Sequence, residues 1–243
     1  MSIKQFFKNF FNKYFYNPHW KCLVCGKEVF EKGQDFCDEC KKSLPYNDGP
    51  ICAHCGRKVI AFENYCSTCK NVLVDLDMCR SAFSYDYPIS KLIKDAKYNR
   101  AIYIIDYFAK QLSLVYFQNY FNADYLVYIP MTEKALEKRG YNQSKMLAEK
   151  LSERINVRVL DCLKKVKDTE RQATLGRAER LKNLDGAFRV VDKKSVVDKN
   201  ILIVDDVSTT GATAQAVASR LKKAGAKIVN LITVASTPPI DKY

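Results

Sequence analysis

From residue 79 onward, short continuous runs of apolar residues alternate with longer stretches in which apolar positions recur every three or four residues. The two densest runs, 125–129 and 201–204, are typical of parallel strands that are buried on both faces. The same patterns predict further strands over 80–85, 157–160 and 228–234, and helices over 88–96, 101–117, 142–154 and 213–224. Strands that alternate with helices predict an α/β fold, with a mostly parallel sheet covered on both faces.

The beginning of the chain has a different pattern. Residues 1–17 place six aromatic side chains at helical spacing with lysines between them, which predicts an amphipathic helix within residues 1–20. The aromatic face of this helix could pack on the chain's own domains. It could also lie on a membrane surface, as a peripheral contact, or in the groove of a partner.

Ten cysteines are present, and nine of them lie before residue 80. Eight form Cys-x-x-Cys pairs, and two such pairs supply the four thiolates that a structural zinc ion takes in a tetrahedral site. A glycine, Gly26 or Gly56, follows the leading pair of each set, where the turn favours a residue without a Cβ. The pattern predicts two zinc ribbons within residues 21–78, with the ligand sets Cys22, Cys25, Cys37, Cys40 and Cys52, Cys55, Cys66, Cys69. An interleaved pairing of the four Cys-x-x-Cys pairs stays open.

Disulfide bonds are the alternative use of these cysteines, and they require an oxidising compartment. Lys4, Lys8 and Lys13 interrupt the apolar residues at the N-terminus, and no small-residue cleavage site follows them. We therefore expect no export signal, a cytoplasmic location and two structural zinc ions.

Composition adds a bias in charge. The chain has 243 residues, of which 47% are hydrophobic and 28% charged, as in a globular protein, and no run approaches the ~18 uncharged apolar residues of a membrane span. The net charge is +13, and +10 of it falls within residues 81–243. This balance favours a polyanionic partner such as nucleic acid, a phosphorylated substrate or an anionic membrane face. A basic surface that serves solubility alone is the alternative.

The most informative segment is 201–213. A buried strand is followed by two adjacent carboxylates, Asp205 and Asp206, and then by a hydroxyl-rich turn that contains Gly211 and leads into a helix. Backbone N–H groups at the start of a helix favour an anion such as phosphate. Two neighbouring carboxylates suit vicinal ribose hydroxyls, and a divalent metal would offset their repulsion. The segment predicts a site for a phosphorylated sugar at the carboxyl end of a strand, with a plain capped turn as the alternative.

This segment resembles, at every position, the phosphoribosyl pyrophosphate (PRPP) motif of the type I phosphoribosyltransferases. The resemblance implies that Asp205 and Asp206 contact the ribose 2′- and 3′-hydroxyls and that the loop 208–213 holds the 5′-phosphate. Two further stretches, 129–143 and 169–188, resemble signatures of the ComF family, the competence proteins of bacterial DNA uptake and their relatives. That family joins N-terminal zinc ribbons to a phosphoribosyltransferase domain, which the resemblance implies here over residues 79–238.

The resemblance also implies the parts of the site. Asp205, Asp206 and Arg139 are the catalytic candidates, and Mg²⁺ would bridge pyrophosphate and ribose oxygens of PRPP. A mobile loop would close over the site through Lys167, Arg171 and Arg177. The residues expected to bind PRPP are Asp205, Asp206, Val207, Ser208, Thr209, Thr210, Gly211, Ala212, Thr213, Met131, Thr132, Lys138 and Arg139. No segment indicates the acceptor, so catalysis itself stays open.

Three functions agree with these features. The first is a ComF-like protein that binds PRPP and Mg²⁺ and handles single-stranded DNA on the cytoplasmic side during natural transformation. The second is a phosphoribosyltransferase of nucleotide salvage, and the third is a non-catalytic PRPP-sensing adaptor that works with a DNA helicase or an inner-membrane DNA channel. The basic residues expected to bind DNA are Lys164, Lys165, Lys167, Arg171, Arg177 and Arg180.

Overall fold

The computed structural model describes residues 20–30, 33–59, 64–66, 69, 75–98, 103–167 and 184–237. The chain divides into two compact units, Met1–Leu44 and Pro45–Tyr243. The amphipathic helix predicted over residues 1–17 lies outside the described residues, and the domain bounds 21–78 and 79–238 stay predictions. Within the part of the chain that is described, no helix has the length and apolar character needed to span a bilayer.

The described part of the first unit is built around its four cysteines. Lys21 and Glu28 form an antiparallel bridge, and the short helix α2 (Asp38–Lys42) begins directly after Cys37. Val29 and Phe36 are buried and supply a small apolar core. The described part of this unit therefore has few buried apolar side chains, as is common for small domains that bind a structural metal.

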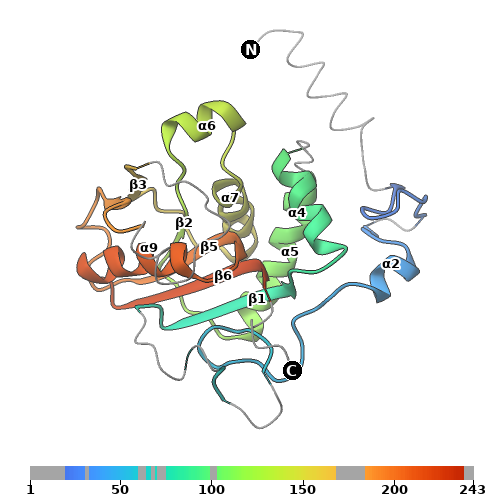
Figure 1. Ribbon diagram of the computed structural model, residues 1–243, viewed down its shortest axis with the longest axis horizontal. Helices are drawn as coiled ribbons and strands as arrows, with labels where there is room; N and C mark the ends of the chain where they lie inside the picture. The colour runs from blue at the N-terminus through green and yellow to red at the C-terminus, as the bar shows by residue number, and fades with distance from the viewer. Residues whose placement is uncertain are drawn as a thin grey trace. The chain divides into compact units, whose positions relative to one another are not determined.

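The second unit contains a four-stranded sheet in the order β1-β6-β5-β2 (Figure 1). Its strands are β1 (Met78–Ser84), β2 (Tyr125–Tyr128), β5 (Asn200–Ser208) and β6 (Ile228–Ser236), and every neighbouring pair is parallel. The mostly parallel sheet predicted from the sequence is confirmed. Its strands are covered by helices because parallel strands of this kind bury both faces.

Helices of the second unit lie on both sides of the sheet (Figure 1). They are α4 (Ile89–Tyr98), α5 (Tyr103–Gln118), α7 (Gln143–Ile155) and α9 (Ala212–Lys223), while α6 (Glu133–Arg139) stands apart from the sheet. Val217, Ala218 and Leu221 of α9 share one buried cluster with Ile201 and Ile203 of β5. Since side chains alternate along a strand, Leu202 and Val204 face the opposite side of the sheet.

Several elements differ from the sequence expectation. A strand was predicted over residues 157–160. In the structure this segment forms only an isolated parallel bridge, between Val159 and Leu126 of β2. The helix α6 was not predicted, nor was the antiparallel pair β3 (Leu163–Lys165) and β4 (Phe188–Val190). Strand β5 continues through both acids to Ser208, because β6 stays paired with it as far as Ser236.

The second cysteine set belongs to the same compact unit as the sheet, and the segment around it packs on β1. The Cys79 N–H donates to the His54 carbonyl at 2.7 Å, and Arg80 Nη1 donates to the Ala53 carbonyl at 3.0 Å. Asn47 Nδ2 donates to the Gly56 carbonyl at 2.6 Å. Two carbonyls of this Cys-x-x-Cys turn and the carbonyl of the glycine that follows it are thus held by hydrogen bonds to residues outside the turn.

Candidate functional site

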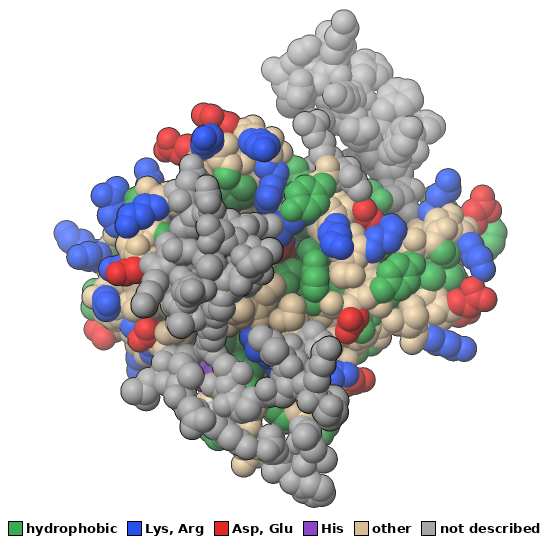
Figure 2. All heavy atoms as spheres, in the orientation of Figure 1, with side chains coloured by type: hydrophobic (Ala, Val, Ile, Leu, Met, Phe, Trp, Pro, Cys, Tyr) green, Lys and Arg blue, Asp and Glu red, His purple; other side chains and the backbone are tan. Residues whose placement is uncertain are grey.

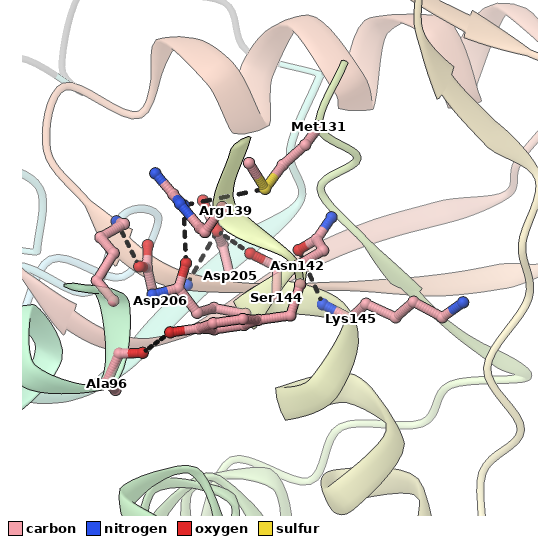
Figure 3. A network of polar contacts seen from close by, with 11 residues as sticks. Ala96, Met131, Arg139, Asn142, Ser144, Lys145, Asp205 and Asp206 are labelled. Carbon is pink, nitrogen blue, oxygen red and sulfur yellow. Dashed lines mark hydrogen bonds and ion pairs between the residues drawn. The ribbon is translucent and has the colours of Figure 1, made fainter. Parts of the chain in front are cut away.

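The two adjacent acids lie near the end of β5, and different elements hold them (Figure 3). Ser144 Oγ, at the start of α7, donates to Asp205 Oδ1 at 2.6 Å, and the Asp206 N–H donates to the same oxygen at 2.9 Å. Lys97 Nζ of α4 lies 2.6 Å from Asp206 Oδ2. Each carboxylate therefore has one oxygen in these contacts and a second oxygen that can accept a hydrogen bond from a ligand.

Asp205 has an unusual protonation equilibrium. Burial and the neighbouring charge of Asp206 raise the pKa of the Asp205 carboxyl from 3.8 to about 7, against the opposing effects of the Ser144 hydroxyl, the Asp206 N–H and the Lys97 charge. Two carboxylates this close disfavour simultaneous ionisation. A ligand that brings hydrogen-bond donors and a cation would favour the fully ionised pair.

Lys97 and Ser144 are site residues that the sequence did not reveal. The side chains of Lys97 and Asp206 are only 12% and 17% exposed, so their ion pair is shielded from water. The Tyr141 hydroxyl donates to the Ala96 carbonyl at 2.5 Å and ties the segment before α7 to α4 (Figure 3). The residues next to Lys97 and Ser144 in the sequence give no local signal of this role, because only the tertiary fold brings α4 and α7 to the end of β5.

The loop after β5 leads directly into α9. Gly211 precedes the helix with φ at 75°, a left-handed conformation that favours glycine, and Ala212 is the first helical residue. The Ala212 N–H donates to Thr210 Oγ1 at 3.4 Å, and the Thr237 N–H donates to the Ser208 carbonyl at 3.0 Å. Exposed N–H groups at the start of such a helix can bind an anion.

Arg139 lies close to the two acids (Figure 3). Its Nη1 donates to Gln143 Oε1 at 2.8 Å and lies 3.9 Å from Met131 Sδ, and its guanidinium carbon is 5.8 Å from the centre of the Tyr98 ring. Thr132 caps α6 by accepting the Ala135 N–H at 3.4 Å. The structure thus brings Met131 and Arg139 together, whereas Lys138 is exposed. Their roles toward PRPP stay predictions.

Of the three residues expected to close over the site, the structure describes Lys167. Lys167 is exposed, and its Nζ donates to the Asp185 carbonyl at 3.3 Å. Arg171, Arg177 and Arg180 lie outside the described residues. These three arginines belong to the segment that connects β3 to β4 in the sequence.

The cysteines form two sets that suit zinc. In each set the four Sγ atoms lie within 4.8 Å of one another, and the sets are Cys22, Cys25, Cys37, Cys40 and Cys52, Cys55, Cys66, Cys69. The Sγ atoms of Cys25 and Cys37 are 3.7 Å apart, and those of Cys55 and Cys66 are 3.6 Å apart. Zinc–sulfur bonds of about 2.3 Å in a tetrahedron place neighbouring sulfurs about 3.8 Å apart, whereas a disulfide needs about 2.05 Å. Sequential pairing is the arrangement found, and the ligand sets fit zinc.

The leading thiol of each set is predisposed to lose its proton. Burial raises the pKa of the Cys22 thiol, but the backbone N–H groups of Cys25, Cys37 and Val24 outweigh it and lower this pKa to about 6. For Cys52 the same balance lowers the pKa to about 7. Zinc binds the thiolate form, so these N–H groups favour metal binding.

Comparisons with known proteins assign different domains to the cysteine-rich part of the chain and to the part that contains Asp205 and Asp206. The family model of the double zinc ribbon domain matches residues 13–70. The model of the phosphoribosyl transferase domain matches residues 138–241. Among solved structures, glutamine PRPP amidotransferase from B. subtilis aligns at 19% identity with a TM-score of 0.38, covering 54% of this chain and 26% of that one.

Curated relatives match along most of the chain. Competence protein F of Haemophilus influenzae is 26% identical over 92% of this chain and 96% of its own length. Competence protein ComFC of Bacillus subtilis is 28% identical over 84% and 89%, respectively. The DNA utilization protein YhgH of Escherichia coli is 25% identical over 89% and 96%. The chain thus combines a double zinc ribbon domain with a phosphoribosyltransferase domain, and the relatives that it resembles over most of its length include competence proteins F and ComFC.

Proposed function

We propose that this protein binds PRPP together with Mg²⁺ at the carboxyl end of β5. The observation that carries the proposal is the pair Asp205 and Asp206, placed directly before a loop that opens into the N-terminus of α9. The carboxylates supply acceptors for two vicinal ribose hydroxyls. The loop supplies N–H and hydroxyl donors for the 5′-phosphate.

Each acid has a defined task in this proposal. Asp205 Oδ1 already accepts from Ser144, and Asp206 Oδ2 is paired with Lys97, which leaves Asp205 Oδ2 and Asp206 Oδ1 to accept ribose hydroxyls. Mg²⁺ would be held by the oxygens of PRPP beside these carboxylates and would neutralise charge on the pyrophosphate. Ser144 and Lys97 fix the orientation of the carboxylates before the ligand arrives.

Transfer of the ribosyl group is the reaction that such a site supports. The bond from carbon 1 to the pyrophosphate oxygen breaks with its electron pair, the acceptor's lone pair forms the new bond, and the acceptor then loses a proton. Arg139, beside the acids, is positioned to stabilise negative charge on the departing pyrophosphate. Release of pyrophosphate with a panel of bases would favour salvage, release with single-stranded DNA would favour action on DNA, and binding without release would favour a sensing role.

The test of PRPP binding is calorimetry on the double variant Asp205→Ala, Asp206→Ala. Loss of two charge-assisted hydrogen bonds, at ~1.5–3 kcal/mol each, should weaken PRPP binding by at least about 3 kcal/mol. The control variant Glu149→Ala, Glu153→Ala removes the same charge from the exposed face of α7 and should bind PRPP normally. Equal affinities for the two double variants would refute the proposal.

We further propose that the protein handles single-stranded DNA on the cytoplasmic side. The register of β3 and β4 places Lys164 directly opposite Arg189, and both side chains are exposed. Like charges directly opposite one another destabilise a strand pair, so the pair of β3 and β4 favours an anionic partner. Figure 2 shows further Lys and Arg side chains on the side of the protein where β3 and α9 lie. A DNA helicase or an inner-membrane DNA channel is the protein partner that we propose for this role, with residues 1–17 as the peripheral membrane contact.

Salt dependence tests the DNA proposal. Neutralising Lys164, Lys167 and Arg189 with glutamine should make the log-affinity against log-salt slope shallower by about two, at ~0.7 for each lost phosphate contact. Neutralising Lys91, Lys94 and Lys110 of α4 and α5 is the matched control. A slope that both triple variants leave unchanged would exclude this surface and favour the adaptor role.

A further inference from the structure

The two cysteine sets are built alike up to the residue that follows the glycine. The Gly26 N–H donates to the Cys22 carbonyl at 2.9 Å, and the Gly56 N–H donates to the Cys52 carbonyl at 2.9 Å. The Cys22 N–H donates to the Lys27 carbonyl at 2.7 Å, and the Cys52 N–H donates to that of Arg57 at 2.8 Å. Lys27 and Arg57 therefore occupy equivalent positions in two copies of one zinc-binding turn.

Their side chains nevertheless have different partners. Lys27 Nζ lies 2.9 Å from Glu39 of the same ribbon, and both side chains are exposed, at 65% and 79%. Arg57 is only 8% exposed, and its Nη2 donates at 2.5 Å to the carbonyl of Thr209, in the loop between β5 and α9. One copy of the turn thus pairs locally, while the other reaches the candidate phosphate loop.

The turn that carries Arg57 cannot move away from the sheet without breaking its packing. A Cβ added at Gly56 would lie 2.4 Å from the Cys79 carbonyl oxygen of β1, whereas one added at Gly26 would meet no atom within 4 Å. The turn and the loop also line one pocket, whose lining includes His54, Cys55 and Arg57 from the ribbon and Ser208, Thr210 and Gly211 from the loop. The segment that carries the second cysteine set is therefore in direct contact with the candidate phosphate loop.

The Arg57 contact determines where the loop points its donors. Thr237 Oγ1 also donates to the Thr209 carbonyl, at 3.0 Å, so this oxygen is held from two sides. In a planar trans peptide the carbonyl and the following N–H point in opposite directions. Holding the Thr209 carbonyl toward the ribbon consequently aims the Thr210 N–H away from it, which is the orientation that an anion in the loop requires.

We propose that Arg57 is a positioning residue for PRPP, and that zinc in the second cysteine set, but not in the first, determines how well the phosphate loop is ordered. Zinc fixes the turn Cys52–Cys55, the turn fixes the backbone of Arg57 through the Cys52 N–H, and Arg57 fixes the Thr209–Thr210 peptide. This inference rests on the proposed binding of PRPP at that loop.

The test compares Arg57→Gln with its matched control Lys27→Gln, each as the full chain with zinc content measured. The charge-assisted hydrogen bond to Thr209 is lost only in Arg57→Gln, so we expect PRPP affinity to fall about tenfold in that variant and to stay unchanged in Lys27→Gln. Amide exchange measured without ligand should become at least about tenfold faster at Thr210 and Gly211, while the core amides of β5 and β6 keep their protection. Arg57→Lys, which retains the charge but has a shorter reach, should fall between these results.

A second pair of variants tests the role of the metal. Cys25→Ser and Cys55→Ser each remove the equivalent ligand of one set, and each should reduce the zinc content from two ions to one. Only Cys55→Ser should accelerate exchange at Thr210 and weaken PRPP binding. If Arg57→Gln leaves both exchange and affinity unchanged, or Cys25→Ser affects them as much as Cys55→Ser does, the inference is wrong. If the unaltered protein fails to bind PRPP, the proposed function is wrong, and the exchange rates still decide whether Arg57 orders the loop.

Discussion

Replacing Asp205 with asparagine should make the protein more stable at neutral pH. Burial and the charge of Asp206 raise the pKa of the Asp205 carboxyl from 3.8 to about 7. An acid whose pKa is raised on folding contributes its full stability only below the unfolded-state pKa, and that contribution disappears as the pH rises through the folded-state pKa. Because a pKa difference of one corresponds to about 1.4 kcal/mol, the ionised carboxylate costs the folded protein about 4 kcal/mol above pH ~7.

Asparagine removes this cost with little change in shape. Its Oδ1 can still accept from Ser144 Oγ and from the Asp206 N–H, and the side chain does not titrate. We expect Asp205→Asn to raise the free energy of unfolding by up to about 4 kcal/mol at pH 8 and by only about 2 kcal/mol at pH 5, where the native carboxyl is mostly protonated. The gain should therefore shrink by about 2 kcal/mol between the two pH values.

Urea unfolding followed by far-ultraviolet circular dichroism measures this change, because, among the described residues, every helix of ten or more residues belongs to the second unit. Asp192→Asn is a control of opposite sign, since the Ser195 hydroxyl and N–H lower the pKa of the Asp192 carboxyl. This control should lose stability at pH 8 and approach the unaltered protein as the pH falls through the lowered pKa. A stability gain for Asp205→Asn that is absent at pH 8, or equal at both pH values, would refute the electrostatic account of the site.

The same contacts support three further predictions. Gly26→Ala and Gly56→Ala both force alanine into a left-handed conformation, which should lower the free energy of unfolding by about 1–2 kcal/mol, but only Gly56→Ala adds a clash with the Cys79 carbonyl, which should cost about 1–3 kcal/mol more. Trp20 fluorescence measures unfolding of the first unit and circular dichroism that of the second. Equal losses of stability in the two variants would contradict the packing of Gly56. The proposed binding of PRPP uses the ionised form of Asp205, so we expect PRPP affinity to fall by up to about tenfold per pH unit below about 7. Calorimetric titrations at pH 6 in buffers of different ionisation enthalpy should therefore show proton release, and no release would contradict the raised pKa of Asp205. The reduced protein should contain two zinc ions, and metal analysis that finds one or none would contradict the two ligand sets.

The sequence predicted the elements whose pattern is set by burial. The runs that became β2 and β5 are buried along most of their length, so their apolar residues are continuous. The helix α6 has no buried residue and hence no apolar periodicity, although Thr132 before it and Gly140 after it are capping residues that could have marked its ends. The strand β3 is three residues long and ends in two lysines, which resembles a loop in composition.

The candidate site was predictable only where one segment carries it. Asp205, Asp206 and the loop to Gly211 are contiguous, so their order along the chain already indicates their chemistry. Lys97 lies 109 residues from its partner Asp206 in the sequence. Arg57 lies 152 residues from its partner Thr209. No local pattern distinguishes these two basic side chains from those on the surface, because the parallel sheet and the packing of the second ribbon bring them into place.

The ion pair between Lys97 and Asp206 has a consequence for the order of events at the site. A metal cation that binds without PRPP must compete for the Asp206 carboxylate with the ammonium group of Lys97, which already contacts it. In the proposed function, PRPP brings Mg²⁺ and hydroxyl donors in the same encounter, so it can compensate the carboxylates in place of Lys97. Binding should consequently be ordered, with metal and sugar phosphate entering as one complex, and Mg²⁺ titrated without PRPP should produce no saturable heat. The unliganded protein thus keeps Lys97 as the counter-ion of Asp206, and we expect the complete ligand to replace it.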